Sequence, residues 1–272
     1  MPFIHPTNPA SRRTRVLING APNSGKSTSL LTFPALRIIL SCPEERGYDV
    51  FPQDDPSTVS LMYEADQLTK NPSSTQVVDE VRKTLLGIIK GEHGIVHTLA
   101  IEGLHKLHAR ILDDLSGGEF FEGATTGGKD GIDPRAYGGA ERKLFDFLSV
   151  ACHSTIPLVI FTAWDEHEAD RKAAMGEKWS DIPTHKMPAL FGKTATRIMG
   201  EFSVIVHASK GKLSPADKEA VYRWQTRPSG DVWGCGIKAP VAITDKIPLY
   251  IPQSWPTLAG YLGITLKGDA LA

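Results

Sequence analysis

A short glycine-containing segment near the start of the chain constrains its fold more than any other feature. It reads Gly20-Ala21-Pro22-Asn23-Ser24-Gly25-Lys26-Ser27-Thr28 and contains the complete pattern G-x-x-x-x-G-K-[ST]. The apolar run Arg15-Val-Leu-Ile-Asn19 precedes it, and residues 26–33 can form a short helix before Pro34 stops it. A glycine-rich loop between a buried strand and a helix is typical of α/β proteins that bind phosphate groups. We therefore expect an α/β fold with this loop at the end of a buried strand.

Each residue type in the segment has a chemical reason to be there. Glycines let backbone N–H groups curl around a β-phosphate, and the following helix presents its positive end. Lys26 can reach the β- and γ-phosphates, and the Ser27 hydroxyl can ligate Mg²⁺. The sequence therefore predicts that residues 20–28 bind ATP, with Mg²⁺ as the second cofactor. The alternative is a glycine turn that only caps a helix.

An acidic residue at the end of another apolar strand would complete the metal side of such a site. Thr98-Leu-Ala-Ile-Glu102 supplies one, although aspartate is the commoner residue at this place in phosphate-loop proteins. The extra methylene of glutamate still allows its carboxylate to reach a water bound to Mg²⁺. We therefore expect Ser27 and Glu102 to be the metal ligands. The alternative is that Glu102 merely ends the strand.

The remaining apolar runs alternate between strand and helix, which is typical of a mainly parallel sheet flanked by helices. Strands are expected at 35–41, 96–102 and 156–162, and helices at 76–90 and 141–153. Strand-like runs between 203 and 241, joined by turns rich in Gly, Pro and Lys, predict antiparallel hairpins near the C-terminal end. Two long polar segments, 115–139 and 165–187, are expected to be functional loops.

Composition narrows the class of protein. The 272 residues are 41% hydrophobic, and no apolar run approaches the length that crosses a bilayer, so we expect no membrane partner. Thirty basic and thirty-one acidic residues leave a net charge of −1, so any nucleic-acid contact must be a local patch. The three cysteines form no CxxC pair, which favours a reducing, cytoplasmic setting.

We expect a flexible lead-in at 1–13, a core at 14–252 and a C-terminal extension at 253–272.

The order of these motifs resembles the RecA-like ATPases. Within them it resembles a phage group similar to ATP-dependent single-strand annealing recombinases. The likeness rests on the 20–28 segment, on the pair Glu44-Glu45, on 98–102, on Tyr137-Gly-Gly and on 156–163. It implies a RecA-like P-loop NTPase core that assembles into a homo-oligomeric ring or filament, hydrolyses ATP and acts in DNA recombination.

The same resemblance implies roles for residues outside the loop. Glu44 or Glu45 would polarise the attacking water, Thr162 would sense the γ-phosphate, and Lys238 would reach the γ-phosphate of a neighbouring subunit. The next candidates for this role after Lys238 are Lys210, Lys212 and Arg227. The alternatives are two solvated acids in a turn, a threonine that only bonds nearby backbone, and solvated surface charges.

The two long loops would face single-stranded DNA, as the resemblance implies. They combine cations with rings on which bases can stack: Lys129, Arg135, Tyr137, Arg171, Lys172, Lys178, Trp179, His185 and Lys186. Interleaved acids dilute this charge, so loops that contact protein, or are merely flexible, remain the alternative. A single-strand-binding protein is a further possible partner.

The rival functions are a motor or loader ATPase in phage replication or packaging, and a nucleotide-gated assembly protein that is not an enzyme. If the chain is phage-encoded, the setting is the host cytoplasm.

Overall fold

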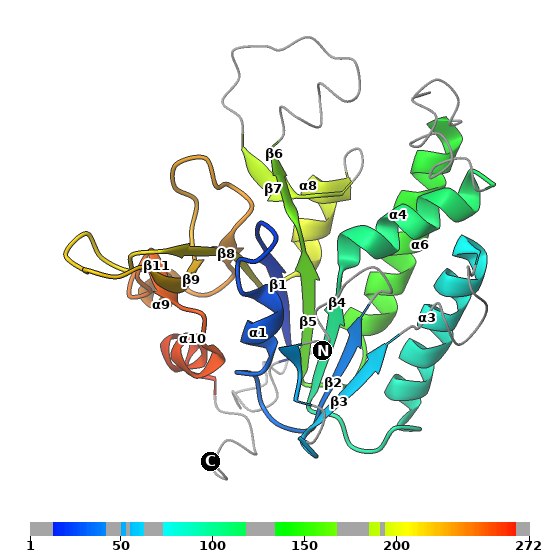
Figure 1. The fold of residues 1–272 in the computed structure, drawn as a ribbon, viewed down its shortest axis with the longest axis horizontal. Coiled ribbons are helices and arrows are strands. Elements are labelled where there is room, and N and C mark those ends of the chain that lie inside the picture. Colours follow the sequence, from blue (N-terminus) through cyan, green and yellow to red (C-terminus); the bar gives the residue numbers. More distant parts are fainter. Residues whose placement is uncertain are drawn as a thin grey trace, which may run out of the picture.

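One nine-stranded sheet forms the centre of the molecule (Figure 1). The computed structural model describes residues 13–41, 50–52, 55–62, 73–117, 134–167, 185–190 and 194–264. Along the sheet the strands run β11-β9-β8-β1-β5-β4-β2-β3, and β10 pairs with β8. They comprise β1 (Thr14–Asn19), β2 (Arg37–Ser41), β3 (Thr58–Met62), β4 (Thr98–Glu102), β5 (Leu158–Ala163), β8 (Val204–Gly211), β9 (Val221–Gln225), β10 (Gly236–Ile237) and β11 (Tyr250–Pro252).

The central strands are parallel and the late ones antiparallel. β1 pairs in parallel with β5 and β8, and β2 does so with β3 and β4. β9 and β10 run antiparallel to β8, and β11 runs antiparallel to β9. This confirms the predicted α/β fold class, with a mainly parallel sheet flanked by helices and antiparallel strands near the C-terminal end.

Helices cover both faces of the sheet (Figure 1). They comprise α1 (Lys26–Leu30), α3 (Ser74–Lys90), α4 (Leu104–Leu115), α6 (Pro134–Cys152), α8 (Thr194–Ile198), η3 (Met199–Glu201), α9 (Val241–Thr244) and α10 (Trp255–Leu262). α3, α4 and α6 lie on one face, and α1 and α10 lie on the other. Among the described helices, none has the length and apolarity needed to cross a membrane.

Strand β1 contributes to both hydrophobic cores because its side chains alternate between the faces of the sheet. Leu17 belongs to the core under α3, α4 and α6, whereas Val16 and Ile18 belong to the core under α1 and α10. All three are fully buried. A strand buried on both faces has a continuous apolar sequence, which is why the run before the glycine segment predicted it.

Three parts of the structure differ from the sequence prediction. α6 begins at Pro134, so Gly138 and Gly139 are helical rather than part of a loop. Proline fits the first position of a helix, and a Cβ on Gly139 would lie 3.0 Å from Leu115 Cδ1 of α4, so this glycine permits close helix packing. The segment 165–187 contains two short paired strands, β6 (Asp165–His167) and β7 (Lys186–Pro188). β3, at the edge of the sheet, was not predicted.

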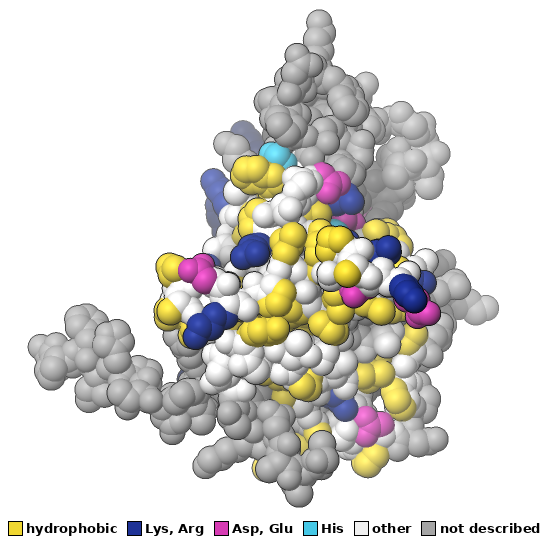
Figure 2. Space-filling model, turned by 90° about the vertical axis from the view of Figure 1, so that its left-hand side faces the viewer, with side chains coloured by type: hydrophobic (Ala, Val, Ile, Leu, Met, Phe, Trp, Pro, Cys, Tyr) yellow, Lys and Arg dark blue, Asp and Glu magenta, His cyan; other side chains and the backbone are white. Residues whose placement is uncertain are grey.

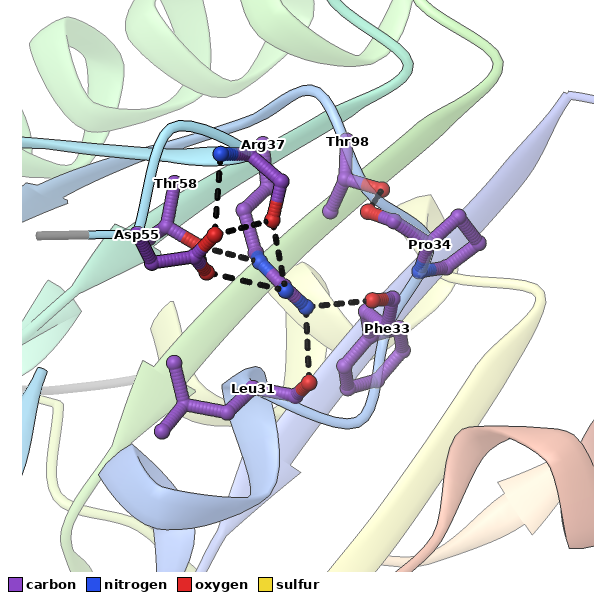
Figure 3. Close-up of polar contacts among 8 residues, drawn as sticks. Leu31, Phe33, Pro34, Arg37, Asp55, Thr58 and Thr98 are labelled. Carbon is purple, nitrogen blue, oxygen red and sulfur yellow. Dashed lines mark hydrogen bonds and ion pairs between the residues drawn. The ribbon is translucent and has the colours of Figure 1, made fainter. Parts of the chain in front are cut away.

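Arg37 ties the end of α1 to the edge of the sheet (Figure 3). Its Nη1 donates to the carbonyl oxygens of Leu31 at 2.7 Å and Phe33 at 2.5 Å, and its Nη2 lies 3.5 Å from Asp55 Oδ2. Asp55 also accepts from Ser57 Oγ at 2.6 Å and Thr58 Oγ1 at 2.7 Å, and these two hydroxyl hydrogen bonds hold the pKa of Asp55 well below its usual range. The guanidinium therefore fixes the turn that leads from the glycine-loop helix into β2.

Candidate functional site

The glycine segment lies at the carboxyl end of the parallel strands, between β1 and α1. This edge is where open α/β sheets bind their ligands. Three of its residues have positive φ angles: Gly20 at 156°, Asn23 at 61° and Gly25 at 86°. The 20–28 segment, defined from here on as the phosphate loop, therefore has the irregular backbone that a loop wrapped around an anion requires.

Both glycines of the motif are required by close packing. A Cβ on Gly20 would lie 2.4 Å from the Ala208 carbonyl oxygen. A Cβ on Gly25 would lie 2.6 Å from Gln253 Oε1 and 2.9 Å from Tyr222 Cδ1. Backbone excludes a side chain at Gly20, and the left-handed φ of 86° disfavours one at Gly25. Strands β8, β9 and the segment after β11 contact the loop from one side.

The Lys26 side chain is buried inside the phosphate loop. Its Nζ donates to the carbonyl oxygens of Gly20 and Ala21, both at 2.7 Å, and lies 3.4 Å from Ser24 Oγ. Only 8% of the residue is exposed. An ammonium group held in the concave side of such a loop can exchange these carbonyl contacts for phosphate oxygens, which are stronger acceptors because they carry charge.

Ser27 and Glu102, the two predicted metal ligands, are in direct contact. The Ser27 hydroxyl donates to Glu102 Oε1, and Ser41 Oγ donates to Glu102 Oε2 at 3.0 Å. Ser41 and Glu102 are register partners on β2 and β4, so the sheet itself aligns them. Mg²⁺ prefers hard oxygen ligands, and the Ser27 hydroxyl and Glu102 carboxylate fit that preference.

Burial sets the protonation of Glu102. The residue is 1% exposed, and burial raises its pKa above the ordinary value, against the opposing hydrogen bonds from Ser27 and Ser41 and the charge of Lys26. A raised pKa means that ionisation costs the folded protein stability. The stability that protonated Glu102 contributes is fully present below the pKa that the residue has in the unfolded state. It is lost as pH rises through the pKa of the folded state.

We expect Glu102→Gln to raise the melting temperature at neutral pH without nucleotide, because the amide has the same shape and carries no charge to bury. The increase should disappear at pH 4, where wild-type Glu102 is protonated. The same variant should weaken Mg²⁺-dependent nucleotide binding. Differential scanning calorimetry at the two pH values measures the first effect, and a lower melting temperature at pH 7 would contradict it.

Of the other predicted catalytic residues, Thr162 lies beside the end of β1, where the loop begins, whereas Lys238 lies away from the loop. Thr162 is buried, and its hydroxyl accepts a hydrogen bond from the Gly103 backbone N–H at 3.1 Å, which holds the turn after Glu102. Lys238 follows β10, which pairs with the amino end of β8, and its Nζ donates to the Gly200 carbonyl. Within its own chain it is therefore at the opposite edge of the sheet from the phosphate loop. Glu44 and Glu45 lie outside the described residues.

The candidate DNA-contacting residues are only partly described. Lys129, Arg171, Lys172, Lys178 and Trp179 lie outside the described residues. Arg135 and Tyr137 are exposed in the first turns of α6, and Lys186 pairs with Asp231 at 3.3 Å. The ring of His185 lies 4.3 Å from that of Trp233, which is 57% exposed and which the sequence analysis missed. On the face shown in Figure 2, Lys and Arg side chains stand apart among apolar and acidic ones.

A buried histidine, His105, lies near the phosphate loop, and no motif in the sequence assigned it to this site. His105 follows the turn after Glu102, its ring stacks on Trp164 at 4.5 Å, and its Nδ1 accepts from the Trp164 backbone N–H at 3.3 Å. Burial, together with the charges of Lys106 and Lys26, lowers the pKa of His105 to about 3. The imidazole is therefore neutral at physiological pH. Because Trp164 and His105 are far apart in sequence, no local pattern indicated the contact.

Comparisons with known proteins identify no family for this chain. No family model matches it, and no curated protein matches it. Among solved structures, the chain has a distant likeness to the assembled ATPase EscN from the enteropathogenic E. coli type III secretion system, with 13% identity and a TM-score of 0.38. The match covers 72% of this chain and 43% of that one, so this chain spans less than half the length of EscN. A likeness with so low a TM-score carries no argument about this chain.

Proposed function

We propose that this protein is an ATPase that binds ATP with Mg²⁺ at the phosphate loop. The observation that carries the proposal is the arrangement of Lys26 inside the loop, with Ser27 and Glu102 in contact beside it. A cation and a pair of oxygen ligands converge on one irregular loop at the carboxyl edge of a parallel sheet. These are the parts that phosphoryl transfer requires from a protein.

Some of these residues would bind the phosphates, and others would stabilise their charge. Backbone N–H groups of residues 20–28 would hold the phosphates, and Lys26 would stabilise the charge on the β- and γ-phosphates. Ser27 and Glu102 would hold Mg²⁺, which when bound supplies positive charge that neutralises the phosphates. We assign the orientation of the attacking water to Glu44 or Glu45, on the strength of the resemblance alone.

We further propose, on the resemblance and the two long loops, that the substrate of the cycle is single-stranded DNA. The protein would act as a homo-oligomeric ring or filament in phage recombination, annealing or pairing strands, with Thr162 and Lys238 communicating the state of the nucleotide. A single-strand-binding protein would deliver the DNA. The proposed units are the lead-in 1–13, the ATPase core 14–252 and the extension 253–272.

Phosphate release by the purified full chain tests the proposal. We expect Mg²⁺-dependent release from ATP that single-stranded DNA accelerates and that duplex DNA accelerates less. Release that stays at background with DNA, while ATP still drives assembly, would favour the nucleotide-gated assembly protein. Directional movement along DNA would favour the motor or loader.

A further inference from the structure

A buried hydrogen bond between Asp165 and His207 joins the two strands on either side of β1. In the sheet, β1 lies between β5 and β8. Asp165 follows β5 closely, and His207 in β8 is the register partner of Asn19, the last residue of β1. His207 Nε2 donates to Asp165 Oδ2 at 2.8 Å, with only 6% and 8% of the two side chains exposed. The pair therefore connects β5 to β8 beyond the end of β1, where the phosphate loop begins.

Gly20, the first residue of the loop, contacts both sides of this connection. The Asp165 backbone N–H donates to the Gly20 carbonyl oxygen at 3.3 Å. On the other side, a Cβ on Gly20 would lie 2.4 Å from the carbonyl oxygen of Ala208, the neighbour of His207. The Gly20 carbonyl also accepts from Lys26 Nζ at 2.7 Å. A chain of direct contacts thus runs from Asp165 and His207 through Gly20 to Lys26.

The electrostatics of the pair favour a fixed geometry. Burial raises the pKa of Asp165, but the hydrogen bond from His207 and the charges of His207 and Lys186 outweigh it, and the pKa lies below its ordinary value. A carboxylate that stays ionised while buried is destabilising unless its partner holds it in place, so separating the two groups is costly. The pair therefore resists changes in the spacing between β5 and β8.

We propose that Asp165 and His207 are positioning residues for the phosphate loop. Their hydrogen bond holds the flanking strands at the spacing that fixes the Gly20 carbonyl, and through it the place from which Lys26 meets a phosphate. Neither side chain needs to touch the nucleotide. The inference rests on the proposed nucleotide binding for its effect on ligand affinity, but not for its effect on the loop itself.

Variants of the pair test this role in two independent ways. Amide hydrogen exchange of residues 20–27, measured without nucleotide, reports the order of the loop. Titration with a fluorescent ATP analogue and Mg²⁺ reports affinity. We expect Asp165→Ala and His207→Ala to accelerate exchange in the loop and to raise the dissociation constant about 10- to 100-fold. His207→Gln, which keeps a donor near the position of Nε2, should remain within about threefold of wild type.

Gln225→Ala is the matched control. Gln225 is the register partner of His207 on β9, is 4% exposed, and donates to the carbonyls of Arg227 at 3.0 Å and Ser229 at 3.2 Å. Its loss should lower the melting temperature while leaving loop exchange and affinity unchanged. If an alanine variant of the pair does not fold, Asp165→Leu, which keeps the shape but cannot accept a hydrogen bond, takes its place with the same expected direction.

Two results would overturn the positioning role. One is wild-type loop exchange in the folded Asp165 and His207 variants, and the other is a change of equal size in Gln225→Ala. Absence of nucleotide binding by the wild-type chain would refute the proposed function instead. In that case the exchange measurement alone decides whether the pair orders the loop.

Discussion

Lys26→Ala should reduce the rate of ATP hydrolysis by about 100-fold or more. The side chain is buried in the phosphate loop, with its Nζ 2.7 Å from the Gly20 and Ala21 carbonyl oxygens. Alanine removes the cation from the place where phosphate charge is expected, and its methyl group is too short to reach that place. Nucleotide affinity should fall as well, by about 10- to 100-fold. Steady-state phosphate release and equilibrium titration measure the two losses.

Lys143→Ala is the matched control for this prediction. Lys143 pairs with Asp114 at 2.8 Å between α6 and α4 and is about half exposed. Exposed ion pairs contribute little to stability, so this variant should retain wild-type hydrolysis and nearly wild-type melting. Full hydrolysis by Lys26→Ala would remove the phosphate loop from the mechanism.

Arg15→Met should lower the free energy of unfolding by about 3 kcal/mol. Arg15 is 6% exposed in β1, and its guanidinium meets the end of α6 and the turn before β5. The bonded carbonyls are those of Cys152 at 2.6 Å, Thr14 at 3.1 Å, Ile156 at 3.1 Å, Ser154 at 3.2 Å and Pro157 at 3.3 Å. Methionine fills similar volume but donates to none of them, so several buried acceptors lose their partner. Urea denaturation at pH 7 measures the loss.

Arg13→Met tests whether the stabilising effect of Arg15 depends on its buried contacts or only on the charge of an arginine. Arg13 lies two residues earlier and donates from Nη1 to the His153 carbonyl at 3.3 Å in an exposed contact. Its loss should cost less than about 0.5 kcal/mol, since water replaces an exposed partner. Equal destabilisation by the two variants would show that the buried carbonyl contacts of Arg15 are not what stabilises this corner.

The parts of the fold that the sequence predicted are those with local signals. β1, the phosphate loop and α1 follow each other directly, and a strand buried on both faces reads as a continuous apolar run. Ser27 and Glu102 were expected at one metal site because each residue closes its own short motif at the carboxyl edge of the sheet, and the structure places their side chains in contact. β3 lacked such a signal, because it is a short edge strand.

The parts that the sequence did not predict depend on contacts between distant segments. Asp165 and His207 are separated by 42 positions, and nothing near either residue indicates the other. Tyr222 and Gln253 reach Gly25 only because β9 and β11 pair at the side of the loop. Such contacts result from the packing of the whole sheet, so residue spacing in one sequence carries no trace of them.

The most direct test of the central claim is to compare the affinities of ATP, ADP and AMP for the wild-type chain by isothermal titration calorimetry with Mg²⁺. A loop that recognises phosphates through Lys26 and its backbone predicts one site per chain, saturated by ATP and ADP, with AMP about 100-fold weaker or worse. Equal affinity for all three nucleotides, or no binding of any, would contradict the account.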